Sequence, residues 1–258
     1  MTMCLRLAAL TATVAMLAPT APAAAEPTSG RCGSTAADAL GWGPPNRVED
    51  FDEYPGGPGW EVYDSVGHGG NGIRTPNALT VGDGVLTITG DELGNSGGLA
   101  LLPGQLYGRW EVCMKSAPAS PNYHSVALLW PDSNVWPNDG EIDFMEILDP
   151  ARTQVTASVL HARPASIESM VDPNDHADIA IDATQWHSWA VDWTPDRITG
   201  YVDGAPWFES ARHVPAGPMH MCIQLDDFGG DLSGGGQVSV DWVRQYPFVS
   251  TEPGEAPG

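Results

Sequence analysis

Apolar and polar side chains alternate along many short stretches of the chain from residue 60 onward. In GVLTITG, residues 84–90, Leu86 and Ile88 alternate with Thr87 and Thr89, and this period of two is typical of a β-strand with one buried face. The stretches with this β character are residues 60–66, 84–90, 108–115, 125–130, 140–147, 155–161, 187–193, 198–204, 220–226 and 238–246. No window sustains a helical period. Many short strands between turn residues predict an all-β sandwich.

The two ends of the chain lack this alternation. Residues 1–25 combine one cation, Arg6, with an apolar run and a final group of small residues, which is the pattern of a secretory signal peptide. The run is shorter than the roughly 20 residues that a membrane anchor needs. We expect a flexible arm over residues 26–45, one domain over residues 46–248 and a disordered tail over residues 249–258. The mature protein is therefore expected to be secreted and to carry no membrane anchor.

The stretch WPNDGEIDFMEI, residues 136–147, places acids inside an otherwise apolar strand. In an extended strand Glu141 and Asp143 share one face, while the residues between and after them point into the core. Glu146 falls out of phase with this alternation. A β-bulge between Asp143 and Glu146 would insert one residue and return Glu146 to the face of the other two acids. The sequence therefore predicts a bulge and a row of three carboxyls.

Three carboxyls this close cannot all ionise easily, because like charges raise one another's pKa. A proton should then stay in the cluster near neutral pH, as an acid catalyst requires. Two carboxyls about 5 Å apart suit a retaining glycosidase, in which one is the nucleophile and the other the acid and base. The alternatives are an acidic calcium site, whose EF-hand pattern is absent, and a solvated strand edge, whose flanking residues would be less apolar.

Composition narrows the classes of partner. The formal net charge of -22 would repel phosphate backbones, so we expect no nucleic acid partner. Of the 4 cysteines, Cys4 lies in the predicted signal peptide, and an exported protein permits a disulfide among the others with one thiol left over. No CxxC pair indicates structural zinc.

The acidic stretch and the segments around it resemble glycoside hydrolase family 16. WPNDGEIDFMEI is similar to the family's signature in its bulged ExDxxE form, found in laminarinases and agarases. DGVLTITG, YGRWEVCMK, WHSWAVDWTPDRITGYVDG and VDWVRQY resemble segments that recur in the family in this order. The resemblance covers about residues 46–248 and implies a β-jelly-roll sandwich of two antiparallel sheets with a concave substrate cleft. It also implies that Glu141 is the nucleophile, Glu146 the general acid and base, and Asp143 an assisting carboxyl.

The resemblance implies further contacts with substrate. Trp136 matches a tryptophan at the floor of the family's cleft, and Trp130 lies just upstream. Flat indole rings stack well on sugar faces. His161 matches a histidine that the family places beside the cleft near the acid catalyst. Gln224 stands where the family often has asparagine, and we expect it to hydrogen-bond a sugar.

Two further expectations follow from the resemblance. Cys113 and Cys222 lie on the polar faces of their strands and could form a disulfide if both strands border the cleft, which would leave Cys32 free. Asp241 matches an aspartate that in many family members binds a structural calcium together with a backbone carbonyl near Gly84. The alternative for Asp241 is an acid that simply faces a turn. No cofactor is expected to be required for catalysis.

The leading functional hypothesis is a monomeric, secreted, endo-acting retaining β-glycanase whose partner is a polysaccharide, with β-1,3-glucan or β-1,3/1,4-glucan as the expected substrate. Alternatives are a family 16 enzyme that acts on galactans or by transglycosylation, and a lectin-like protein that binds β-glucan without turnover. A serine hydrolase using Ser96 of GNSGG would need a helix after that serine, and we interpret this stretch as a loop instead.

Overall fold

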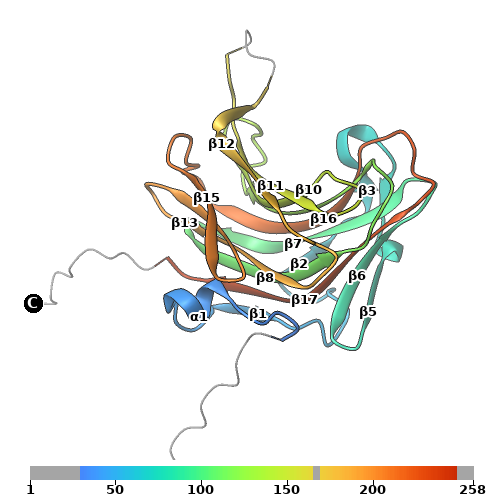
Figure 1. Ribbon diagram of the computed structural model, residues 1–258, viewed down its shortest axis with the longest axis horizontal. Coiled ribbons are helices and arrows are strands. Elements are labelled where there is room, and N and C mark those ends of the chain that lie inside the picture. Colours follow the sequence, from blue (N-terminus) through green and yellow to red (C-terminus); the bar gives the residue numbers. More distant parts are fainter. Residues whose placement is uncertain (1–29, 165–168, 249–258) are drawn as a thin grey trace, which may run out of the picture.

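The computed structural model describes residues 30–164 and 169–248 of the chain. The predicted signal peptide at 1–25, the first residues of the predicted arm and the predicted tail at 249–258 lie outside the described residues. Within the described part, two large sheets stack face to face, and the prediction of an all-β sandwich is confirmed (Figure 1). No helix in this part is long and apolar enough to cross a membrane.

The first sheet forms the outer, convex layer. In spatial order its strands are β15 (Ala205–Ser210), β14 (Ile198–Val202), β13 (His187–Trp193), β8 (Gly108–Ser116), β17 (Gly236–Tyr246), β6 (Val85–Gly90) and β5 (Leu79–Gly82), with β1 (Arg47–Glu49) paired to β17. All of these pairs are antiparallel.

The second sheet carries the concave face. Its strands in spatial order are β12 (Val171–Ala180), β11 (Gln154–Leu160), β10 (Glu141–Ile147), β9 (Tyr123–Pro131), β16 (Met219–Asp227), β7 (Asn95–Gln105), β4 (Ile73–Arg74) and β3 (Ser65–Val66), with β2 (Trp60–Val62) paired to β7. The pairs are antiparallel except β4 with β7, which is parallel. Two short 3₁₀ helices, η1 (His68–Gly70) and η2 (Pro76–Ala78), lie before β4 and before β5.

Alternation along each strand divides its side chains between the core and the outer face of its sheet. On β9, Ala127 and Leu129 enter the core between the sheets, whereas Val126 and Leu128 point into the cleft. The core between the layers is closely filled by aromatic and branched side chains, among them the fully buried Trp193. A well-packed core gives the cleft residues a rigid floor.

Residues 30–45, within the predicted arm, contain a short helix and a disulfide-bonded cysteine that pack on the convex sheet, which differs from the loose segment that the sequence predicts. Helix α1 (Ala36–Leu40) begins at Thr35, whose side chain accepts a hydrogen bond from the Asp38 N–H at 3.0 Å. The buried carboxylate of Glu111 on β8 accepts the N–H of Ala36 at 2.6 Å, so the helix N-terminus docks on the convex sheet. A five-residue helix is too short to show a hydrophobic period, and the sequence therefore gave no signal for it.

The disulfide joins Cys32 to Cys113, and the predicted pairing of Cys113 with Cys222 is wrong. Cys113 lies on β8 of the convex sheet and faces outward against Trp242, whereas Cys222 lies on β16 of the concave sheet. The sandwich core separates the two side chains. Cys222 is the buried free thiol among the described cysteines.

Candidate active site

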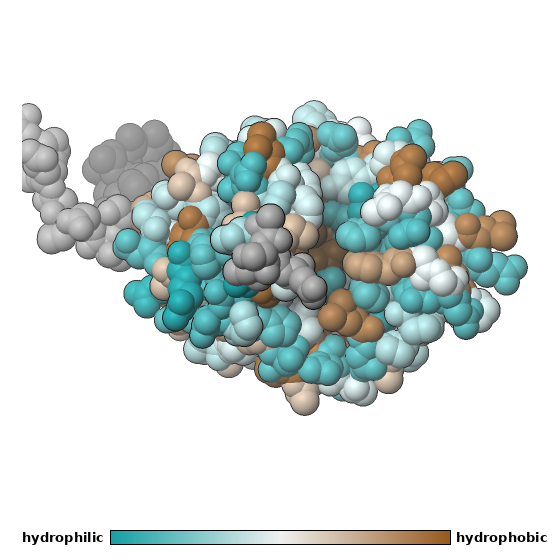
Figure 2. All heavy atoms as spheres, turned by 90° about the horizontal axis from the view of Figure 1, so that it is seen from above, coloured by the Kyte–Doolittle hydropathy of each residue, from teal (hydrophilic) through white to brown (hydrophobic). Residues whose placement is uncertain are grey.

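The concave sheet holds a cleft of about 1040 Å³. Its walls come from β7, β9, β10, β11 and β16 and from the segment around η1. The face shown in Figure 2 is hollowed near its centre, where hydrophobic atoms lie between hydrophilic side chains. Ligand pockets commonly have volumes of about 300–1,000 Å³. The cleft is therefore large enough for several sugar units.

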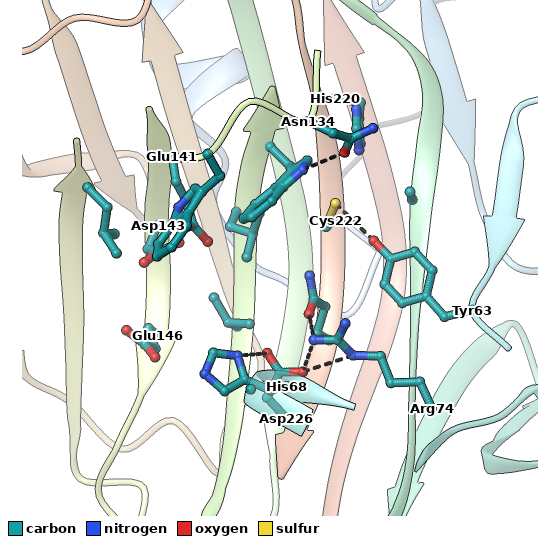
Figure 3. Close-up of a pocket in the computed structure, with 18 of the residues that line it drawn as sticks. Tyr63, His68, Arg74, Asn134, Glu141, Asp143, Glu146, His220, Cys222 and Asp226 are labelled. Carbon is teal, nitrogen blue, oxygen red and sulfur yellow. Dashed lines mark hydrogen bonds and ion pairs between the residues drawn. The ribbon is translucent and has the colours of Figure 1, made fainter. Parts of the chain in front are cut away.

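The predicted bulge is present in β10. Against β11, Asp143 pairs with Ser158 and Glu146 pairs with Thr156, so three steps on β10 match two steps on its neighbour. The extra residue lets both Phe144 and Met145 enter the core. Glu141, Asp143 and Glu146 all line the cleft as a result, and their side chains lie along one strand in Figure 3.

The three carboxyls occupy a dry and mutually repulsive environment. Burial, followed by the neighbouring charge of Glu141, raises the pKa of Glu146 to about 7. Burial also raises the pKa of Glu141, opposed by hydrogen bonds from Trp136 and Asp143. Burial and the charges of both glutamates raise the pKa of Asp143 well above its ordinary range, so Asp143 is the acid that holds a proton beside Glu141. The pKa values of Glu141 and Glu146 are both raised to about 7, so the trio keeps a proton near neutral pH, as an acid catalyst requires.

Trp136 fixes the position of Glu141. Its indole Nε1–H donates to Glu141 Oε2 at 2.7 Å, and its ring stacks on that of Trp130 with centroids 6.1 Å apart. Trp130 is held in turn by a 2.8 Å hydrogen bond from its Nε1 to Asn134 Oδ1. Both predicted tryptophans thus line the cleft and present a stacked aromatic wall beside the carboxyls.

Trp136→Phe is expected to lower kcat/KM about tenfold, because it removes a hydrogen bond to a charged group and keeps an aromatic ring. Without the indole donor the pKa of Glu141 rises further, so the acidic limb of the pH–rate profile moves to higher pH. Trp130→Phe is the matched control, since it leaves the Glu141 hydrogen bond intact and should not move that limb. An unchanged acidic limb in Trp136→Phe would contradict the assigned role of the indole.

Strand β16 supplies the opposite wall. Gln224 lines the cleft as predicted, and its Oε1 accepts from Arg74 Nη2 at 2.5 Å. The same guanidinium pairs with Asp226 at 2.5 Å, and His68 Nδ1 lies 3.8 Å from the other oxygen of Asp226 (Figure 3). Strand alternation places Asp226 on the face of Gln224. Nothing in the sequence indicates that Arg74, about 150 residues upstream, reaches the same point.

Two more contacts shape the ends of the cleft. Tyr63 donates its hydroxyl to the Cys222 sulfur at 3.1 Å, and burial raises the pKa of this thiol to about 12, so Cys222 is an inert part of the floor. At the other end, Phe228 stacks between His68 and His124, with centroid distances of 4.1 and 4.0 Å. Burial lowers the pKa of His124 to about 4, so a neutral imidazole lies 4.0 Å from Glu146.

His161 takes a different position from the one expected. The register pairs Thr156 with Glu146 and Leu160 with Glu141, so His161 follows the end of β11 that lies away from the expected acid catalyst. Its ring stacks on His213 with centroids 3.4 Å apart, and it is not among the residues that line the cleft. Ser96 lies within strand β7, not in a loop, and its hydroxyl is buried.

The residues around Asp241 do not fit the expected calcium ion. Asp241 accepts the Arg31 backbone N–H at 2.7 Å on one oxygen and Arg31 Nε at 3.0 Å on the other. Arg31 Nη2 also donates to the carbonyl of Asp83, next to Gly84, at 3.1 Å. The guanidinium therefore lies between the two expected ligands, and a divalent cation there would meet a like charge.

A two-layer β sandwich whose concave face carries three carboxyls on one bulged strand defines a glycosidase. The sequence pattern of Glycosyl hydrolases family 16 matches residues 70–244, and the chain belongs to this family. The beta-glucanase of Rhodothermus marinus is 26% identical over 169 residues, which cover 55% of this chain and 58% of that protein. The beta-glucanase of Acetivibrio thermocellus is 27% identical over 212 residues, which cover 73% and 59%. The matches thus span less than two thirds of these relatives.

Solved structures share the fold. The laminarinase from Rhodothermus marinus superposes with a TM-score of 0.69 at 23% identity, covering 80% of this chain and 98% of that chain. A lichenase derived from a mouse hindgut metagenome superposes with a TM-score of 0.66 at 23% identity, covering 78% and 99%. The jelly-roll prediction is thereby confirmed.

Proposed function

We propose that this chain is a retaining, endo-acting β-glucanase. The observation that carries the proposal is the bulge in β10, which brings Glu141, Asp143 and Glu146 to one side of the cleft. Burial raises the pKa of both glutamates, and hydrogen bonds oppose that rise for Glu141 while none does for Glu146. Both pKa values are about 7, so near neutral pH one glutamate can be ionised while the other keeps its proton, as a nucleophile and a general acid require, and its hydrogen bonds favour Glu141 as the ionised one.

The expected reaction is a double displacement. The Glu141 carboxylate attacks the anomeric carbon while Glu146 gives its proton to the glycosidic oxygen, and the bond to the leaving sugar breaks. Glu146, now ionised, takes a proton from water as the water oxygen attacks the anomeric carbon. The ester to Glu141 then breaks, and both glutamates return to their starting states. Asp143 holds its proton against Glu141 and favours the ionised form of the nucleophile.

The proposed substrate is β-1,3-glucan or mixed β-1,3/1,4-glucan. The curated relatives are beta-glucanases, and the solved structures of the same fold include a laminarinase and a lichenase. The stacked indoles of Trp130 and Trp136 offer a flat surface to a glucose ring. Buried polar groups on β16 offer hydrogen bonds to hydroxyl groups.

Secretion is part of the proposal. The signal-peptide pattern at the N-terminus supports it, and so does the disulfide between Cys32 and Cys113, since disulfides persist in oxidising compartments. N-terminal sequencing of the protein recovered from culture medium tests it. A chain that starts at Glu26 is the expected result, and a protein retained in the cytoplasm with Met1 intact would contradict it.

The substrate and the stereochemistry can be tested together. The protein is incubated with laminarin, lichenan, agarose, carrageenan and xyloglucan, and the anomer formed first is followed by proton NMR. Release of β-anomer from laminarin or lichenan is expected. The α-anomer as first product would overturn retention, and release from agarose or carrageenan alone would overturn the substrate. Glucan binding without turnover would leave a lectin-like protein.

We further propose that Arg31 takes the place of a structural calcium. EDTA should leave the Tm of the wild type unchanged, while Arg31→Ala should lower it by about 2 to 4 °C, because Asp241 loses the guanidinium that pairs with it. Calcium should restore part of that loss in Arg31→Ala only. The matched control is Arg197→Ala, which removes an exposed ion pair to Glu209 and should change Tm by about 1 °C or less. A lower wild-type Tm in EDTA would contradict the proposal.

A further inference from the structure

Three potential metal ligands meet outside the cleft, where the edges of the two sheets come together. His161 follows β11, Asp175 lies on β12, and His213 follows β15. One ligand atom from each residue lies within 4.8 Å of those of the other two, and Asp175 Oδ2 faces both Nε2 of His161 and Nδ1 of His213. Asp175 is fully buried, which is costly for a carboxylate unless it is paired or bound to a cation. The buried carboxylate therefore favours positive charge beside it, either from an imidazolium or from a metal ion.

Other groups already orient two of these ligands. His161 Nδ1 lies 3.1 Å from the carbonyl of Ala162, and a carbonyl can only accept, so this nitrogen carries the proton and Nε2 has a free lone pair. That Nε2 is buried and has no hydrogen-bond partner. Asp175 Oδ1 accepts from the Ser210 hydroxyl at 2.5 Å, which leaves Oδ2 to face the two imidazoles. Histidine and carboxylate ligands of a metal are typically oriented by such outer hydrogen bonds.

The distances suit an ion once the two stacked imidazoles turn apart. Zinc binds nitrogen and oxygen at about 2.0–2.2 Å, so two ligands of one tetrahedral ion stand roughly 3.3 Å apart. Asp175 Oδ2 lies 3.8 Å from His161 Nε2 and 2.5 Å from His213 Nδ1, and these values bracket that spacing. The two imidazoles are stacked 14° from parallel and would fan apart as an ion enters. His213 can make this movement because its side chain is 38% exposed.

We propose that His161, Asp175 and His213 form a zinc site, with water as the fourth ligand. Two imidazoles and one carboxylate are ligands that Zn²⁺ binds in tetrahedral sites. The ion takes the place of the direct contact of 2.5 Å between His213 Nδ1 and Asp175 Oδ2. β12 is the edge of the concave sheet, β15 is the edge of the convex sheet, and the two pack on the same side of the sandwich (Figure 1). The ion therefore ties the two layers together.

The test uses untagged protein that has been freed of metal and is then titrated with Co²⁺ and with Zn²⁺. Binding of one Co²⁺ per chain should produce the visible d–d absorption of a tetrahedral nitrogen and oxygen site, and Zn²⁺ should remove it. Zinc at a hundredfold excess over its Kd should raise Tm by about 5 to 10 °C. His213→Ala should abolish the Co²⁺ absorption and weaken zinc binding at least about tenfold.

His187→Ala is the matched control. His187 lies 2.6 Å from Asp203 in a comparable imidazole–carboxylate pair that has no second histidine, so its loss should leave the Co²⁺ spectrum intact. His213→Ala removes a half-exposed side chain after a strand end, and its metal-free Tm reports whether it folds like the wild type. Absence of the tetrahedral absorption in the wild type would overturn the proposal. So would a zinc-dependent rise in Tm that is the same in His213→Ala.

Discussion

Glu141→Gln is expected to lower kcat on β-glucan by at least about 10⁴-fold, with little change in the affinity for the polysaccharide. An amide has almost the same shape as a carboxylate, and Trp136 Nε1 can donate to its oxygen as it donates to Glu141 Oε2 now. The amide oxygen is, however, too weak a nucleophile to attack the anomeric carbon. Reducing-sugar release measures the loss of turnover, and co-sedimentation with insoluble glucan measures the retained binding.

Glu209→Gln is the control for this substitution. Glu209 is an exposed glutamate on β15 that pairs with Arg197 away from the cleft, so the same chemical change there should leave kcat unchanged.

Addition of azide to Glu141→Ala should yield an α-glycosyl azide, because the small anion attacks the face that the carboxylate has vacated. Full activity in Glu141→Gln would contradict its assignment as the nucleophile.

The stability of Glu141→Gln provides an independent check. Burial raises the pKa of Glu141 in the folded protein from the ordinary 4.5 to about 7. A raised folded pKa means that the folded state binds the proton more tightly, so stability is full below about pH 4.5 and falls as the pH rises toward 7. The glutamine has no charge to bury, and its Tm should exceed that of the wild type at pH 8 but not at pH 4.

The acidic strand was predictable because its signal is local. Alternation alone places Glu141 and Asp143 opposite the core residues, and only one inserted residue returns Glu146 to their face. Each of these statements concerns neighbours along a single strand, whose side-chain period is fixed by backbone geometry. The register of β10 against both of its neighbours confirms the bulge.

The two long strands of the concave sheet that escaped prediction, β7 and β12, did so because tertiary packing outweighs their composition. β7 contains Gly97, Gly98 and Pro103, which indicate a loop, yet a Cβ on Gly98 would lie 2.8 Å from the Tyr63 ring. The glycine is needed for this close approach. β12 is polar and contains Pro173, which a sheet tolerates at its edge, and β12 is an edge strand.

Contacts between distant parts of the chain could not be predicted. The position of Cys113 depends on the sheet to which β8 belongs, and alternation assigns a face to a side chain without assigning its strand to a sheet. Arg31 reaches Asp241 across 210 positions, and Arg74 reaches Asp226 across 152. A single sequence contains no signal for such pairs. The first pair places the Arg31 guanidinium between the expected calcium ligands, and the second places the Arg74 guanidinium in the wall of the cleft.

Glu146→Ala should separate the two steps of the reaction. On unactivated glucan its kcat/KM is expected to fall about 10²- to 10⁴-fold, because nothing protonates the leaving oxygen. A dinitrophenyl β-glucan oligosaccharide carries a leaving group that needs no proton, so the first step should continue and the glycosyl ester on Glu141 should accumulate as a burst. Azide should then attack the ester from the opposite side and release a β-glycosyl azide, the other anomer from that of Glu141→Ala.

The pH profile tests the same residue without added reagents. The pKa of Glu146 is raised to about 7 by burial and by the charge of Glu141, so the wild type should lose kcat/KM above about pH 7 as Glu146 gives up its proton. His124, whose pKa is lowered to about 4, is neutral through this range and cannot cause that limb. In Glu146→Ala with the dinitrophenyl substrate, the fall of kcat/KM above about pH 7 should vanish. A limb that persisted would mean that another group carries the essential proton.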